Sequence, residues 1–101
     1  MKVFLDDVRA APEGWTLVRT AREAIAALKT GAVTELSLDH DLGGDDTIGT
    51  GHDVLVWIEE AVALRGFEPP SLFVHSANPV GRQRMQQAIE SIERLRKERM
   101  H

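Results

Sequence analysis

Polar side chains that could bind a cation or transfer a proton follow three hydrophobic runs, each typical of a buried strand. The runs are Lys2–Leu5, Glu35–Leu38 and Leu72–Val74. Because ligands of open α/β sheets bind outside the carboxyl ends of parallel strands, we expect the side chains after these runs to share one site. They are Asp6 and Asp7 after the first run, Asp39, His40 and Asp41 after the second, and His75 and Ser76 after the third.

Asp6, Asp7 and Asp39 are the candidate metal ligands. Neighbouring carboxylates repel each other, and a bound cation, a basic side chain or a raised pKa must offset that repulsion. One to three carboxylates with several retained waters commonly hold Mg²⁺ beside a phosphate. The pattern therefore predicts a divalent cation site, for Mg²⁺ or Mn²⁺. The alternative is that these acids cap turns or pair with Arg9 and Arg19.

His40, His75, Ser76 and Asp39 are the candidate catalytic residues. Histidine titrates nearest to neutral pH, so either imidazole could give a proton to a leaving alkoxide or take one from water. A structural role is the alternative for each histidine. Ser76 lacks a Gly-x-Ser-x-Gly surrounding, which favours hydrogen bonding to a phosphoryl oxygen over nucleophilic attack. Asp39 could attack phosphorus directly, and the residues alone do not separate that route from attack by water.

A helix start after Ser76 offers a place for the phosphate. Asn78 is a good N-cap, and Pro79 suits the first helical position. The free N–H groups and positive dipole end of a helix start attract anions. We therefore expect Ser76, Asn78 and Arg82 to bind phosphate. His52 and Asp53, at the start of the preceding helix, are weaker candidates, because helix capping explains Asp53.

Strands and helices alternate along the chain, which predicts an α/β fold with a parallel sheet. Crossover rules favour either a small three-layer sandwich or a partly open two-layer one. Thr20 and Glu23 predict a capping box at the start of the first helix, and Gly31 predicts the end of the same helix. The predicted strands are Met1–Leu5, Trp15–Arg19, Thr34–Leu38 and Ser71–Val74; helices run from Thr20 to Gly31, His52 to Arg65 and Pro79 to Lys97, and Gly43–Gly51 is a flexible loop or lid.

Length and composition indicate one domain over residues 1–101. No apolar run approaches the ~20 residues that span a bilayer, so we expect no membrane contact. The absence of Cys excludes thiolate chemistry and fits a cytoplasmic location.

Residues 81–101 are basic, which indicates a solvated helix face or a weak phosphate or RNA surface. Basic and aromatic residues are not interleaved, so we expect no stacking platform for single strands.

In order and position, these residues resemble the receiver domains of two-component signalling. Receivers place an acidic pair after the first strand, a phosphorylatable Asp after the third and Ser or Thr after the fourth. The chain departs from that pattern in lacking the first helix and the fifth strand. A receiver also has an essential Lys after its fifth strand, whereas the lysines here are Lys2, Lys29 and Lys97.

The chain is more similar to the cyclic-phosphate-processing receiver-like family, a compact branch of this flavodoxin-like fold. The resemblance implies about four strands with three helices and a role in processing cyclic phosphate ends, such as those of cleaved RNA. Arg9, within the first motif, completes the predicted phosphate-binding set. The shared motifs are Leu5-Asp6-Asp7-x-Arg9, Pro12-x-Gly14-Trp15, Arg19-Thr20, Ser37-Leu38-Asp39-His40-Asp41-Leu42-Gly43 and His75-Ser76-Ala77-Asn78-Pro79-x-Gly81-Arg82.

The leading hypothesis is a divalent-cation-dependent phosphoesterase acting on cyclic phosphates, either 2′,3′-cyclic nucleotides or RNA ends. One alternative is a signalling receiver that accepts a phosphoryl group on Asp39. Another is a non-catalytic module that binds cyclic phosphates or RNA ends, or that docks proteins. A sheet edge left open by the missing fifth strand could also pair two copies into a homodimer.

Overall fold

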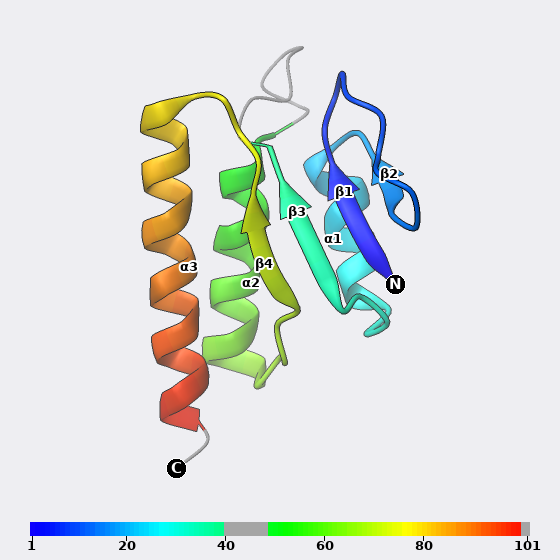
Figure 1. Cartoon of the computed structure of the whole chain (residues 1–101). Helices are drawn as coiled ribbons and strands as arrows, with labels where there is room; N and C mark the ends of the chain where they lie inside the picture. Colours follow the sequence, from blue (N-terminus) through cyan, green and yellow to red (C-terminus); the bar gives the residue numbers. More distant parts are fainter. Residues whose placement is uncertain (40–48, 100–101) are drawn as a thin grey trace.

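In the computed structural model, which describes residues 1–39 and 49–99, four parallel strands form a sheet in the order β2-β1-β3-β4. Three of them, β1, β3 and β4, are contiguous and point the same way (Figure 1). The predicted adjacency of the three runs that precede the polar clusters is therefore confirmed. The strands are β1 Lys2–Leu5, β2 Thr16–Val18, β3 Glu35–Leu38 and β4 Ser71–Val74.

The helices α1 (Ala21–Lys29), α2 (Gly51–Arg65) and α3 (Pro79–Arg99) all pack on one face of this sheet. Figure 1 shows α1 and α2 behind the strands, with α3 alongside α2. Of the two layer arrangements that the sequence allows, the open two-layer sandwich is the one formed. In the part of the chain that the structure describes, no helix combines the length and apolar character needed to cross a bilayer.

Alternation along the strands decides what faces the helices. Val3 and Leu5 of β1, and Leu36 and Leu38 of β3, are fully buried in the shared core. Each such side chain contributes about 1.5–3 kcal/mol through the hydrophobic effect. Residues between them point to the opposite face of the sheet, which carries no helix among the described residues. The helical side of the core comes from Ala21, Ala24, Leu28, Val54, Leu55, Ile58, Val62, Met85 and Ile92.

The ends of α1 largely follow the sequence prediction. Thr20 is the N-cap, and its hydroxyl oxygen accepts the Glu23 N–H at 3.1 Å. The predicted capping box is half wrong, because the Glu23 carboxylate accepts the Thr20 hydroxyl at 3.2 Å rather than the Thr20 backbone N–H. Gly31, with φ of 78°, follows the helix in the left-handed conformation expected of a terminating glycine.

The start of α2 differs by one residue from the prediction. The helix begins at Gly51 rather than His52, and its N-cap is Thr50. Thr50 and Asp53 form a complete capping box, which agrees with the capping role expected for Asp53. The helix ends at Arg65, as predicted, and Gly66 follows it in the left-handed conformation with φ of 66°. Most of the predicted Gly43–Gly51 loop lies outside the described residues.

Candidate functional site

Asp6, Asp39 and His75 come together at the carboxyl edge of the sheet. One potential ligand atom from each lies within 4.8 Å of the others. The three residues directly follow β1, β3 and β4 and extend the strand ladder. The Asp39 N–H donates to the Leu5 carbonyl, and the His75 N–H donates to the Leu38 carbonyl, both at 3.0 Å. The shared site expected from the strand ends is thus formed by these three residues.

Asp6 is the most enclosed group of the site, with 1% of its surface exposed. Its Oδ1 accepts the backbone N–H groups of Val8 and Arg9, each at 2.8 Å, and its Oδ2 contacts His75 Nε2 at 3.1 Å. Burial raises the pKa of the Asp6 carboxyl, but the N–H groups of Arg9 and Val8 and the ring of His75 outweigh it and lower this pKa below its ordinary value. Asp6 is therefore a carboxylate at neutral pH.

The imidazole of His75 is held from three directions. Because an ionised Asp6 can only accept hydrogen bonds, Nε2 carries a hydrogen and donates to it. In the neutral ring Nδ1 then accepts the hydroxyl of Ser37, at 2.7 Å. Phe4 stacks on the ring with centroids 4.1 Å apart and planes 6° apart. The sequence reasoning assigned no role to Ser37 or Phe4, although each lies two residues before a site aspartate and so on the same strand face.

Gly51 controls how closely α2 approaches Asp39. A Cβ at Gly51 would overlap the carbonyl oxygen of Asp39 and lie 2.8 Å from Met85 Cε. The first residue of α2 is therefore packed directly against the backbone of a site residue. The sequence reasoning placed Gly51 in a flexible loop, because a close backbone approach between distant segments leaves no local signal.

Two arginines connect the loops around the site through backbone carbonyls. Arg9 Nη1 donates to the His75 carbonyl at 3.5 Å, and Arg19 Nη1 donates to the carbonyls of Asp6 and Arg9 at 3.2 and 3.3 Å. Within residues 1–39 and 49–99, the side chain that hydrogen-bonds to the Asp6 carboxylate is that of His75 and not that of either arginine. The two arginines thus contact the backbone around Asp6 and do not neutralise its carboxylate directly.

Ser76 and Asn78 build the start of α3. Ser76 is 4% exposed, and its Oγ accepts the Asn78 N–H at 3.1 Å. Asn78 Oδ1 accepts the N–H groups of Val80 and Gly81, both at 3.1 Å, which confirms the predicted N-cap. Arg82 is exposed in the first turn, and its N–H donates to the Asn78 carbonyl. The helix start therefore lies directly after the strand end that carries His75.

The remaining predicted site residues lie elsewhere. Asp7 is half-buried in the bend after β1 and is not part of the group formed by Asp6, Asp39 and His75. His40 lies outside the described residues. His52, in the first turn of α2, has a buried Nδ1 without a hydrogen-bond partner among the described residues. Of the three predicted metal ligands, Asp6 and Asp39 are thus brought together, and His75 completes their group.

A family comparison agrees with this geometry. The model of the family described as Cyclic-phosphate processing Receiver domain matches residues 1–91. The chain belongs to this family. In this cyclic-phosphate processing receiver domain, the match includes all four strands and every described residue of the site. Searches among curated proteins and among solved structures gave no match.

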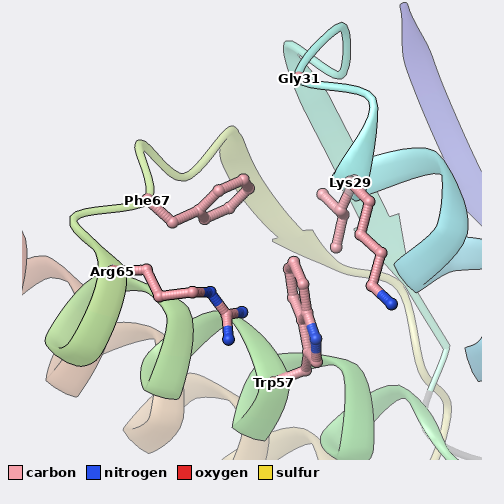
Figure 2. A pocket seen from close by; sticks show the side chains of 6 residues that line it. Lys29, Gly31, Trp57, Arg65 and Phe67 are labelled. Atoms are coloured by element: carbon pink, nitrogen blue, oxygen red, sulfur yellow. The ribbon is translucent and has the colours of Figure 1, made fainter.

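A pocket of about 390 Å³ lies at the other end of the receiver domain, near the amino ends of β3 and β4. In Figure 2 its labelled residues come from the end of α1 and the turn after it, from the middle and end of α2, and from the segment that follows α2. The Arg65 guanidinium lies 5.4 Å from the Trp57 ring centroid, and the Trp57 ring meets Phe67 edge-on. None of the predicted site residues lines it; the lining residues are Leu28, Lys29, Gly31, Trp57, Arg65 and Phe67.

Proposed function

We propose that this receiver domain is a divalent-cation-dependent phosphoesterase that opens cyclic phosphates, either 2′,3′-cyclic nucleotides or the cyclic ends of RNA. The observation that carries the proposal is the grouping of Asp6, Asp39 and His75 within 4.8 Å, next to the start of α3. Two carboxylates alone would repel an anionic substrate. A cation between the two carboxylates, with the positive dipole end of α3 nearby, would instead attract an anionic substrate.

The donor set fits a hard divalent cation. Carboxylate oxygens of Asp6 and Asp39 are the ligands that Mg²⁺ and Mn²⁺ prefer. His75 donates Nε2–H to Asp6, so in this arrangement it orients a ligand rather than binding the cation itself. The chemistry that a bound cation supplies is Lewis-acid polarisation of a phosphoryl oxygen. The proposal keeps Asp7 as a further ligand reached through water.

The proposed reaction is hydrolysis of one ester bond of the ring. Water adds to phosphorus, one ring P–O bond breaks, and the released alkoxide takes up a proton, so the product is an open phosphomonoester. His75 or His40 transfers the proton. The phosphate oxygens bind to side chains around the start of α3, where the positive dipole end of the helix favours an anion. Those side chains are Ser76, whose hydroxyl hydrogen can donate, together with Asn78, Arg82 and Arg9.

A hydrolysis assay tests the proposal. The purified protein is incubated with 2′,3′-cyclic nucleotides and with cyclic-phosphate-ended RNA, in Mg²⁺, Mn²⁺ or EDTA. We expect cation-dependent turnover that falls about 100-fold or more in Asp39→Asn and His75→Ala. Glu60→Gln is the matched control for loss of a carboxylate, because Glu60 is exposed on α2. Full activity in both site variants would show that the assigned site is wrong.

The same variants separate this reaction from phosphoryl acceptance on Asp39. None of the three lysines belongs to the strand ends that form the site: Lys2 begins β1, Lys29 ends α1, and Lys97 is in the last turn of α3. None of these lysines can therefore take the part of the lysine that receivers use beside their phosphorylated aspartate. A stable phosphoryl adduct on Asp39 after acetyl phosphate treatment, without turnover of cyclic phosphates, would favour the acceptor function instead.

A further inference from the structure

The helix-free face of the sheet carries a row of residues directly below the site. The strand register pairs Phe4 with Leu17 on one side and with Ser37 on the other, and Ser37 pairs with Phe73. Residues in register on parallel strands point to the same face. The next row on that face, two residues further along each strand, contains Asp6, Asp39 and His75.

Neighbouring side chains shield Phe4 in this row from solvent, whereas Phe73 is exposed. Phe4 is 8% exposed, because Trp15 meets its edge and the His75 ring stacks on its face. Phe73 is 47% exposed and lies outside the hydrophobic core. Among the described residues no ring stacks on it. An exposed aromatic ring thus stands on β4, the strand that ends in His75.

The position of Phe73 suits the base of a nucleotide whose phosphate is in the site. Two residues along a strand correspond to about 6–7 Å, and an adjacent strand adds about 5 Å. These spacings match the ribose that separates a nucleobase from its 2′,3′-phosphate. Exposed aromatic rings on an open sheet face are a recurrent means of stacking single bases in RNA-binding domains.

We infer that Phe73 stacks on the base of the substrate, which makes nucleoside 2′,3′-cyclic phosphates and RNA ends the preferred substrate class of the site. The inference rests on the proposed function. Stacking accepts any base, because every base has a π-face, so we expect little discrimination among the four. A single ring stacks on a single base. This differs from a stacking platform for several bases of a single strand, which the sequence does not predict.

The test compares two substrates that differ only in the base. One is a nucleoside 2′,3′-cyclic phosphate, and the other is methyl riboside 2′,3′-cyclic phosphate, which keeps the sugar and lacks the base. In Phe73→Ala we expect kcat/KM to fall about tenfold for the nucleoside and to stay unchanged for the riboside, equivalent to about 1.4 kcal/mol of stacking. Phe73→Trp should restore the nucleoside preference. Leu64→Ala is the control for loss of an exposed apolar side chain, because Leu64 is 78% exposed on α2.

Calorimetric binding of the same two compounds to catalytically impaired Asp39→Asn, with and without Phe73→Ala, separates this inference from the proposed function. If no variant hydrolyses either compound but binding of the nucleoside depends on Phe73, the stacking role holds and the phosphoesterase proposal fails. If both compounds are hydrolysed equally well, or Phe73→Ala weakens both equally, the stacking inference is overturned and the hydrolytic proposal remains. Binding of neither compound would also overturn it.

Discussion

The two ends of the sheet differ in how their polar groups are satisfied. At the carboxyl end, Asp6, His75 and Ser37 are joined by hydrogen bonds and largely withdrawn from solvent. At the amino end, the pocket has a substantial volume, but Lys29 and Arg65 at its rim are exposed. Both cations lie in the last turn of a helix, where they complement the negative dipole end. We therefore assign the proposed function to the end with buried, hydrogen-bonded polar groups and not to the end with the pocket.

The chain direction explains why the ends differ. In a parallel sheet with connecting helices, strand ends and helix starts lie at one pole, and helix ends lie at the other. The positive dipole end at a helix start favours phosphate, whereas the negative dipole end at a helix end opposes it. A phosphate in the pocket of Figure 2 would meet the ends of α1 and α2. The same anion at the other pole would meet the start of α3.

The largest expected effect contrasts the two ends in catalysis. Asp6→Asn should reduce hydrolysis of a 2′,3′-cyclic nucleotide about 100-fold or more, because it removes one of two carboxylates that hold the cation. The double variant Lys29→Ala, Arg65→Ala should keep wild-type turnover, because the pocket takes no part. Steady-state rates measure both, with circular dichroism to check folding. A loss of turnover in the Lys29→Ala, Arg65→Ala variant would contradict the prediction that only the carboxyl end of the sheet takes part in hydrolysis.

A smaller effect concerns two glycines, one at each end. Gly51→Ala should lower the free energy of unfolding by about 3 kcal/mol, because its Cβ meets the Asp39 backbone, which cannot move aside as a flexible side chain could. Gly31→Ala should cost about 1 kcal/mol, because its positive φ is strained but its surroundings are open. Urea unfolding measures both values. Equal costs would show that α2 does not press on Asp39.

The smallest expected effect is a difference in acid sensitivity. The folded pKa of Asp6 lies below its unfolded value of about 3.9, so its stabilising contribution is present above that value and lost as pH falls through the folded pKa. The stability difference between wild type and Asp6→Asn should therefore shrink on acidification from neutral pH. The pocket double variant should keep the wild-type acid sensitivity. Free energies of unfolding are measured for both proteins at neutral and at acidic pH. A stability difference between wild type and Asp6→Asn that is the same at every pH would contradict this account.

Local patterns were sufficient to predict most elements of the receiver domain. The cores of all four strands and three helices lie where hydrophobic periodicity, the Thr20 and Asn78 caps and the terminating glycines indicated. These signals act within a few residues, so they can be interpreted without knowledge of the fold. The errors were of the same local kind. They were shifts of one or two residues at the ends of elements, such as the start of α2, and one hydrogen bond in the predicted capping box of α1.

The site was only partly predictable, because its partners come from distant segments. Asp6, Asp39 and His75 were candidates from their places after strands, and the strand order brought them together. Ser37 and Phe4 had no assigned role, since their importance comes from contact with His75, which belongs to a different strand. Asp7, the other candidate ligand beside Asp6, lies outside the group of Asp6, Asp39 and His75, because consecutive residues at a strand end point in different directions.

Residue types and their periods determined that this chain forms strands ending in carboxylates and imidazoles. Tertiary structure alone decided which of those groups meet and which aromatic ring stands beside them. The physical reason is that side-chain direction follows a local period of two, whereas proximity depends on strand order and register. The order β2-β1-β3-β4 places His75 across from Asp6 and leaves Phe73 exposed on the same face, next to the site.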